Sequence, residues 1–407
     1  MVLKCGEFIL VPNQPQRVPL SFVAMWGHGP LQYDFSEADE ALAARTPDGR
    51  LKIDFRCPLS GVDGYGRHAV WLIRAFQRAG VDIAVRDVGW VDNDYLAPDI
   101  NEMRYRANRQ LPSKIGVSFT LGYDPNLYQH SSPVKIGITQ FETDTLPRKH
   151  VENVNKLDHC IVTSRFQVKV FQRSGVTVPI TVMSPGIEAS EFPYGNRRMN
   201  REFRVLIIGA LTPRKNPLGA IRIFREASQG NPDWRLTIKT RPAAAGLAEV
   251  RRLAAGDSRI TVLAKDDDPY TLVQHYYEHH CLLWPSLGEG VGLPPLEAMA
   301  TGMELVCSAN SGMLDYVDPA YCYPIKMAGM QSAHGPGVFS DEYVEQFGSV
   351  GQWWTPDEAH AAKQLSRCFD NWVRGKGKGR HASGVVHECF TVDQSVASIL
   401  PVLERFA

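Results

Sequence analysis

The chain has 407 residues, of which 44% are apolar, so it is long enough to bury two ordinary hydrophobic cores. Its 44 basic and 44 acidic residues cancel, which excludes an overall field that would recruit nucleic acid or an anionic membrane. The eight cysteines are scattered without a C-x-x-C pair, as is typical of reduced thiols, so we expect a cytoplasmic protein. No apolar stretch reaches transmembrane length, and we expect no stable membrane span.

Residues 1–50 have no clear hydrophobic period and contain several prolines and glycines. They carry no motif that points to a function. We therefore expect an N-terminal extension of unknown role that packs on the first domain.

A βαβ pattern begins at Leu51. Apolar residues alternate over 51–56, which predicts a strand, and the glycine-rich turn 60–66 follows. Val70, Ile73 and Phe76 then recur at helical spacing up to Gly80, and the next strand is expected at 81–85. Further elements are expected as strands at 115–118, 135–138 and 160–162 and as a helix at 164–173 capped by Ser164.

A second series of the same kind follows a stretch at 193–201 that looks like a linker with little to bury. Its strands are expected at 204–208, 235–239, 260–263 and 281–284, and its helices at 217–227 and 269–278. The sequence therefore predicts an α/β fold of two Rossmann-like, doubly wound domains facing a cleft, over 51–197 and 198–390. Ligands of such sheets bind beyond the carboxyl ends of the strands.

The most informative segment is 284–302, where a buried strand ends at Trp284 and a helix begins after a glycine-rich turn. Glu289 and Glu297 bracket this turn with seven residues between them. Backbone N–H groups and a helix N-terminus there suit an anion or sugar oxygens, and the two carboxylates suit hydroxyls. The alternative is that Glu297 is a favourable acid in the first helical turn and Glu289 a solvated loop residue.

A second segment, 209–217, also lies between a strand and a helix. Asn216 is expected as the N-cap and Pro217 as the first helical residue. Lys215 therefore lies beside the positive end of a helix, next to Arg214, and this combination suits a diphosphate. The alternative is a pair of solvated cations on a loop.

These two segments resemble the GT-B family of retaining glycosyltransferases often called group 4, and the resemblance extends from about Leu51 to the C-terminus. It implies a transferase that uses a nucleoside diphosphate sugar as donor substrate, without a cofactor or catalytic metal. It also implies that a C-terminal helix, within residues 391–407, crosses back onto the first domain, which would bind the acceptor.

The resemblance implies roles for individual residues. Glu297 would bind the ribose and Lys215 the diphosphate, with Arg214 beside it. The transferred sugar would meet Glu289 and the amides of Gly290, Val291, Gly292 and Leu293. From the first domain, the turn containing Gly64 and Tyr65 would close over the phosphates. Lys265 lies in the loop that would meet the nucleobase.

Two positions depart from the family pattern. Ala210 stands where members commonly carry an arginine, and Arg214 or Arg241 would have to supply that charge. The region 138–147 contains no histidine, although many members place one there near the reacting carbon. It resembles a subgroup with a glutamate instead, so Glu142 is a candidate for a hydroxyl contact and a third catalytic residue with Glu289 and Lys215. The alternative for Glu142 is an acid at the start of a helix.

No metal site is expected. Asp266, Asp267 and Asp268 directly precede Pro269 and the start of a helix, so an N-cap cluster explains them better than metal ligands. His275 and His279 share a helix face, but the segment lacks a second pair of zinc ligands, and a structural role is the better interpretation.

Other functions of the same architecture stay open. A sugar-nucleotide epimerase would need no acceptor, and a nucleotide-sugar-binding protein impaired in catalysis would account for Ala210. The sequence does not identify the base, the sugar, the acceptor or the oligomeric state. The acceptor could be a glycan, a lipid-linked sugar, a protein or a modified base.

Overall fold

The computed structural model describes residues 8–10, 17–19, 43–89, 95–107, 113–197, 202–335 and 338–407. The chain divides into two compact units, residues 1–42 and residues 43–407. In the first unit, β1 (Phe8–Leu10) pairs with β2 (Arg17–Pro19) in antiparallel fashion. The expected packing of residues 1–50 on the first domain falls mainly on residues outside the described ones.

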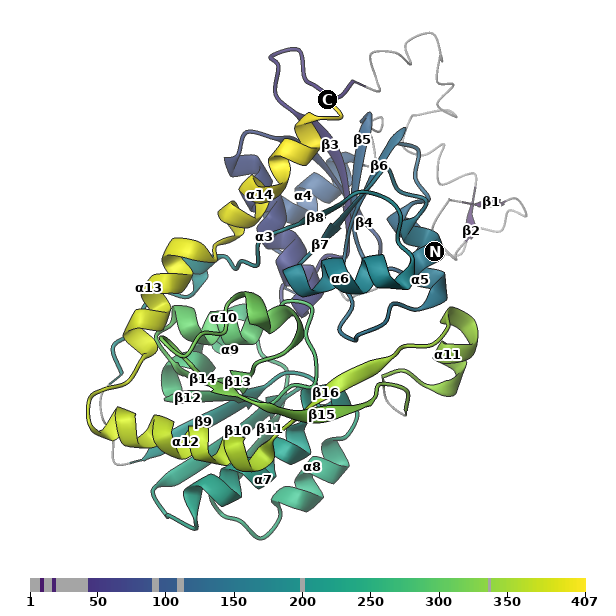
Figure 1. The fold of residues 1–407 in the computed structure, drawn as a ribbon. Coiled ribbons are helices and arrows are strands. Elements are labelled where there is room, and N and C mark those ends of the chain that lie inside the picture. Colours follow the sequence, from purple (N-terminus) through teal and green to yellow (C-terminus); the bar gives the residue numbers. More distant parts are fainter. Residues whose placement is uncertain are drawn as a thin grey trace. The chain divides into compact units, whose positions relative to one another are not determined.

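The second unit contains two six-stranded parallel sheets (Figure 1). The first has the order β4-β3-β5-β6-β7-β8 and the second the order β11-β10-β9-β12-β13-β14. The strands of the first sheet are β3 (Lys52–Cys57), β4 (Asp82–Asp87), β5 (Ile115–Phe119), β6 (Val134–Thr139), β7 (His159–Val162) and β8 (Ile180–Val182). Those of the second are β9 (Phe203–Ile208), β10 (Trp234–Thr240), β11 (Ile260–Ala264), β12 (Cys281–Trp284), β13 (Glu304–Ser308) and β14 (Tyr323–Ile325).

Helices connect the strands, as parallel pairing requires. In the first domain these are α3 (Gly64–Arg78), α4 (Pro98–Ala107), α5 (Arg148–Val154) and α6 (Arg165–Ser174). In the second they are α7 (Pro217–Ser228), α8 (Leu247–Ala254), α9 (Pro269–Glu278) and α10 (Leu293–Ala300), followed by α12 (Glu358–Val373) and α13 (Gly379–Cys389). The predicted class of two Rossmann-like, doubly wound α/β domains is confirmed.

The strand orders locate the places where a ligand can bind. In each sheet the chain leaves a central strand in one direction and later returns on its other side, which creates a crevice at the carboxyl ends of two neighbouring strands. These neighbours are β3 and β5 in the first sheet and β9 and β12 in the second. The segments after β9 and β12 are the two that the sequence singled out.

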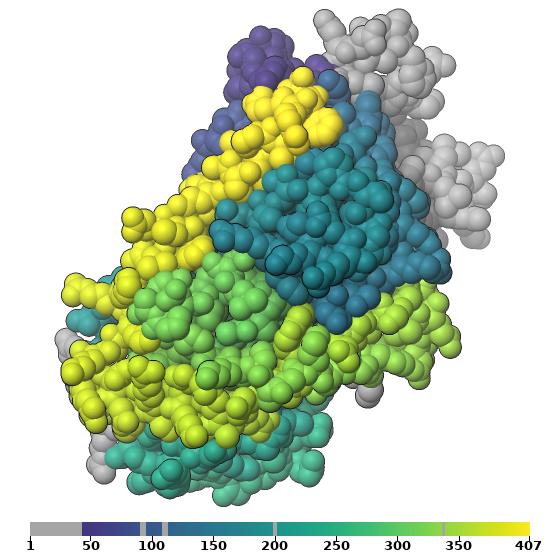
Figure 2. Space-filling view, viewed as in Figure 1, coloured from purple at the N-terminus to yellow at the C-terminus, as the bar shows by residue number. Residues whose placement is uncertain are grey.

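Two segments beyond the sheets join the domains. The C-terminal helix α14 (Val392–Glu404) packs on α3, and Arg78 of α3 bonds Asp393 at 2.8 Å. In Figure 2 the yellow C-terminal segment runs as one band from the second domain to the first. The hairpin of β15 (Met327–Ser332) and β16 (Gln352–Pro356), with α11 (Asp341–Phe347) between its strands, extends from the second domain. It contacts the first domain, where Gln352 N–H donates to Asp144 at 2.7 Å.

Three local predictions need correction, and two of them concern helix starts. The turn expected at residues 60–66 ends earlier, because the Asp63 carboxylate accepts the N–H groups of Tyr65 and Gly66 and starts α3 at Gly64. Ser164 stands at the N-terminus of α6, but its side chain makes no capping hydrogen bond.

The stretch at 193–201 is the third, since it is more than a linker in the part that the structure describes. Arg197 donates to the carbonyls of Tyr276, His279 and Thr301 at 2.6–2.9 Å and so ties this segment to the second domain. Within the described residues, no helix combines the length and apolarity needed to cross a bilayer.

Candidate functional site

A cavity of about 750 Å³ lies between the two domains of the second unit. From the first domain it is lined by the start of α3 and by residues that follow β5 and β6. From the second it is lined by segments that follow β9, β10 and β12, including residues 208–210, 239–241 and 289–294. The volume is in the range of small-molecule sites, and both topological crevices open into it.

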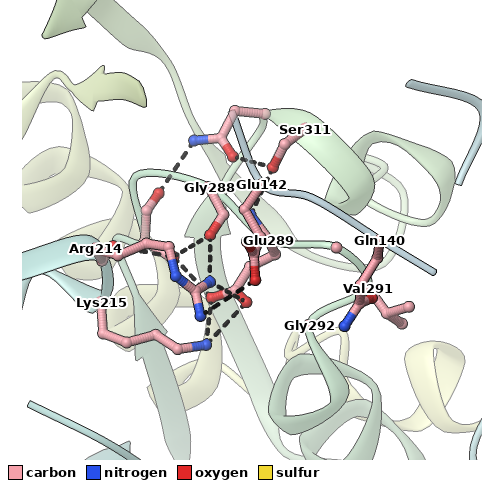
Figure 3. A network of polar contacts seen from close by, with 12 residues as sticks. Gln140, Glu142, Arg214, Lys215, Gly288, Glu289, Val291, Gly292 and Ser311 are labelled. Carbon is pink, nitrogen blue, oxygen red and sulfur yellow. Dashed lines mark hydrogen bonds and ion pairs between the residues drawn. The ribbon is translucent and has the colours of Figure 1, made fainter. Parts of the chain in front are cut away.

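Glu289 is the centre of the polar network in this cavity (Figure 3). Lys215 Nζ donates to its Oε1 and Oε2 at 2.6 and 2.8 Å, and Arg214 donates to Oε2 at 2.9 Å. Ser286 Oγ donates to Oε1 at 2.7 Å. The Glu289 side chain is buried, so the predicted alternative of a solvated loop residue is wrong.

The pair of Lys215 and Glu289 is ionised at neutral pH. Burial raises the pKa of the Glu289 carboxyl, but the positive charges of Lys215 and Arg214 lower it by more. The net effect is a pKa of about 2, below the ordinary glutamate value of 4.5. Burial lowers the pKa of the Lys215 ammonium to about 8, because its attraction to Glu289 only partly offsets the loss of water. Lys215 also lies 4.6 Å from the centroid of the Trp284 ring.

The backbone explains how Lys215 comes to this place. β9 ends at Ile208, and Gly209 follows with φ +126°, in a region that favours glycine. A short turn over 213–215 leads to Asn216, whose side chain accepts the Gly219 N–H and starts α7 at Pro217. This confirms the predicted N-cap. Asn216 also donates to the Pro285 carbonyl at 3.2 Å and so joins the two loops.

The glycines of the turn after β12 allow the two domains to touch. A Cβ on Gly288 would lie 2.2 Å from the Glu142 carbonyl oxygen, and one on Gly290 would lie 2.1 Å from Gln140 Oε1. In addition, Thr163 and Gln167 of the first domain both donate to the Gly290 carbonyl at 3.4 Å. At Gly288 the close neighbour is the Glu142 backbone, so a larger residue there would push the domains apart, whereas at Gly290 it would displace the Gln140 side chain.

Glu297 lies differently from the prediction. α10 begins at Leu293, so Glu297 is in its second turn and is no acid of the first turn. The side chain is buried at the cavity wall, where Arg67 of α3 bonds Oε1 at 2.9 Å and the Tyr276 hydroxyl donates to Oε2. Arg67 itself is buried, 4.8 Å from the centroid of the Trp71 ring. The second carboxylate is thus held from the first domain.

The first-domain candidates line the same cavity. Glu142 lies 3.6 Å from the Arg214 guanidinium, and because α5 begins only at Arg148, the alternative of an acid at the start of a helix is wrong. Gly64 and Tyr65 lie in the first turn of α3, and the Tyr65 ring stacks on Phe119 with centroids 4.7 Å apart.

The remaining candidates are not among the described residues that bond Glu289. The Lys265 side chain is 54% exposed, pairs with Asp267 at 3.0 Å, and is not among the residues that line the cavity. Arg241 and Ala210 do line it. Asp268 caps α9 by accepting the Thr271 N–H, as the sequence predicted.

The described residues contain no group of three or more histidine, cysteine and acidic side chains placed to hold a metal ion. His275 bonds Asp267 at 2.8 Å, and His279 bonds the His275 carbonyl at 2.7 Å. Both therefore have structural partners.

Sequence reasoning missed several residues of the cavity wall, above all Arg67, His68, Thr240 and Trp284. Arg67 and His68 follow the glycine-rich turn directly, and this adjacency is the signal that could have found them. Thr240 ends β10 and Trp284 ends β12, which are carboxyl ends of parallel strands.

Comparisons with known proteins find similarity to glycosyltransferases. Residues 162–333 match the model of a family described as "Family 4 Glycosyltransferase in conflict systems", and this range contains Lys215, Glu289 and Glu297. D-inositol 3-phosphate glycosyltransferase 2 of Catenulispora acidiphila is 25% identical over 224 residues, which are 47% of this chain and 51% of that protein. This chain thus spans about half the length of that curated relative.

Two solved structures share the fold. Sucrose-phosphate synthase from Thermosynechococcus elongatus aligns with a TM-score of 0.61 at 16% identity, over 88% of this chain and all of that one. The Anabaena protein HepE, solved in complex with UDP and glucose, aligns with a TM-score of 0.59 at 12% identity, over 87% and 99%. The chain therefore has the GT-B fold, and its predicted resemblance to the group 4 glycosyltransferases is confirmed.

Proposed function

We propose that this chain transfers a sugar from a nucleoside diphosphate sugar to an acceptor hydroxyl, with retention of configuration and without a catalytic metal. The observation that carries the proposal is the buried pair of Lys215 and Glu289 at the crevice between β9 and β12, inside a cavity of about 750 Å³. The UDP and glucose bound to HepE support UDP-sugars as the first donors to test.

Glu289 is fully engaged before any donor binds. A carboxylate has about four acceptor sites, and Lys215 takes one on each oxygen while Ser286 and Arg214 take the others. A diphosphate is a stronger attraction for Lys215 because it carries more charge. When Lys215 turns to it, both Glu289 oxygens regain an acceptor site, which is then free for hydroxyls of the transferred sugar.

The charge of the leaving group is offset by the same basic side chains. As the bond between the sugar and the diphosphate breaks, its electron pair stays on the phosphate oxygen, and the negative charge there grows. Lys215 and Arg214 lie at the site before the reaction starts, so they can stabilise this charge with little reorganisation. In this proposal Arg214 also supplies the cation that Ala210 lacks.

Backbone groups complete the proposed donor site. No hydrogen bond from the N–H groups of Gly290, Val291, Gly292 or Leu293 is found among the described residues, and all four residues line the cavity. N–H groups at the start of a helix favour phosphate or sugar oxygens. We assign the ribose to Glu297, because Arg67 and Tyr276 occupy one acceptor site on each of its oxygens and leave the others.

The proposal is tested by incubating the full chain with UDP-glucose, UDP-N-acetylglucosamine and GDP-mannose and a panel of acceptors. The acceptors are glycans, a lipid-linked sugar, a protein and DNA with hydroxymethylated bases. We expect acceptor-dependent release of the nucleoside diphosphate, an α-linked product from whichever of these α-configured donors is used, and no loss of rate with EDTA. Conversion of the donor without any acceptor would instead indicate an epimerase, and the absence of both reactions would refute the proposal.

A further inference from the structure

Three polar side-chain atoms in the cavity wall have no hydrogen-bond partner among the described residues: His68 Nε2, Thr240 Oγ1 and Trp284 Nε1. Their side chains are almost fully buried, with exposed fractions of 3%, 2% and 3%. A buried polar atom without a partner destabilises the fold, so native proteins pair nearly all of them. Three such atoms lie in the wall of this one cavity, where a polar ligand would pair them.

His68 is the one of the three that comes from the first domain. It lies on α3, one turn after Gly64, and its ring packs edge-on against Phe119 and Trp71 at 5.3 and 6.4 Å between centroids. A phenylalanine would make these ring contacts equally well and would leave no unpaired nitrogen. Packing alone therefore does not account for an imidazole at this position.

We propose that His68 is a substrate-contacting residue whose imidazole hydrogen-bonds a sugar hydroxyl at the first-domain wall of the cavity. This inference rests on the proposed function. Two observations carry it, the position of His68 in the lining of the cavity and its unpartnered, buried Nε2.

The chemistry of the ring fits a hydroxyl better than a phosphate. Burial lowers the pKa of the His68 imidazole to about 4, so the ring is neutral at physiological pH. A neutral imidazole has one N–H donor and one acceptor nitrogen, and a hydroxyl likewise donates and accepts. A phosphate oxygen would only accept, and the two cations assigned to it, Lys215 and Arg214, lie on the second domain. The hydroxyl belongs either to the transferred sugar or to the acceptor.

His68→Phe tests the inference because it keeps the ring and removes both nitrogens. We expect kcat/KM to fall at least tenfold while the melting temperature stays at or above that of the wild type. His68→Gln, which can donate and accept, should recover part of the rate. As a matched control, His159→Phe removes a buried histidine outside the cavity that bonds Thr181, and it should lower the melting temperature without changing kcat/KM.

Calorimetry with UDP and UDP-glucose distinguishes the two sources of the hydroxyl and needs no turnover. If the transferred sugar is the partner, His68→Phe weakens the binding of UDP-glucose and leaves that of UDP unchanged. If the acceptor is the partner, both affinities stay and the KM for the acceptor rises. If the wild-type chain turns over no donor, the proposed function is refuted. If the wild type turns over a donor and His68→Phe has the same kcat/KM as the wild type, only the role of His68 is refuted. A His68→Gln variant that is no more active than His68→Phe refutes that role as well.

Discussion

The two carboxylates that bracket the turn after β12 are held in opposite ways. Glu289 is bonded by Lys215, Arg214 and Ser286, all of its own domain, and its acceptor sites are filled. Glu297 is bonded across the domain boundary by Arg67 and keeps acceptor sites free. The same short segment therefore serves two purposes: one end forms a charged centre within a domain, and the other end fastens the two domains together.

This difference teaches that a spacing motif alone does not define what its residues do. Glu289 needs a change in its partners before it can bind a ligand, whereas Glu297 can bind one without losing Arg67. Variants that change the partners of only one of the two carboxylates should therefore have different effects. A change beside Glu289 should lower the rate of the reaction, and a change beside Glu297 should lower the stability of the contact between the domains.

The largest effect on stability is expected for Arg67→Met. The change leaves the Glu297 carboxylate buried without its cation, and breaking a buried ion pair in this way typically lowers the free energy of unfolding by about 3–5 kcal/mol. Thermal unfolding measures the loss, and the double variant Arg67→Met with Glu297→Gln should recover part of it because the uncompensated charge is gone. A double variant no more stable than Arg67→Met would contradict the ion pair as the cause.

The largest effect on chemistry is expected for Lys215→Ala. Removing one cation that stabilises the leaving diphosphate should lower kcat by about 100- to 1000-fold. The initial rate of nucleoside diphosphate release measures it. Lys169→Ala, which removes an exposed lysine of α6, is the matched control and should keep the wild-type rate. A Lys215→Ala variant with the wild-type rate would mean that the diphosphate binds elsewhere.

A smaller loss of stability is expected for Gly288→Ala, since the added Cβ would lie 2.2 Å from the Glu142 carbonyl oxygen and push the domains apart. Overpacking of this kind lowers the free energy of unfolding by about 1–3 kcal/mol. Gly384→Ala is the control, because a Cβ there meets no atom within 4 Å and α13 favours alanine over glycine. Equal melting temperatures for the two variants would show that the domains do not meet as closely as described.

The smallest effect is a pH dependence that runs in opposite directions for activity and stability. Lys215 must be charged to hold a diphosphate, so kcat/KM should fall as the pH rises through about 8. The stability contributed by this lysine should rise over the same range, because between about 8 and the ordinary lysine pKa of 10.5 the unfolded chain holds more protons than the folded one.

The Glu289 carboxyl has a lowered pKa, so its contribution to stability should be complete above the ordinary glutamate pKa of 4.5 and be lost as the pH falls towards about 2. Rates and melting temperatures measured from about pH 2 to about pH 11 test both pH dependences, since this range spans the two windows. In Lys215→Arg the decline in activity near pH 8 should disappear, because arginine stays charged. A decline that persists in this variant would belong to another group.

Much of the fold could be predicted from the sequence because its strands are short apolar runs between glycine and proline signals. The strand at 281–284 and the helix at 269–278 have the predicted bounds. The hairpin of β15 and β16 was missed, since most residues of β15 are exposed and show no apolar alternation. β13 was missed as well, and it begins with the buried charge of Glu304, whose carboxylate accepts the N–H groups of Lys378 and Gly379.

The candidate site could be predicted only within the second domain. Lys215 and Glu289 follow neighbouring strands, and the rule for parallel sheets brings such residues together. The bond between Arg67 and Glu297 joins residues 230 positions apart in different domains, and no local pattern reports it. His68 was missed although it follows the glycine-rich turn directly, because the cavity wall to which it belongs exists only after the domains meet.

The central claim is tested most directly by a crystal structure of the full chain with bound UDP or, if the donor panel indicates another base, with that nucleoside diphosphate. We predict phosphate oxygens within hydrogen-bond distance of Lys215 Nζ, a ribose hydroxyl on Glu297, and Glu289 released from at least one contact to Lys215. A nucleotide outside this cavity, or one whose phosphates leave the pair of Lys215 and Glu289 unchanged, would contradict the account.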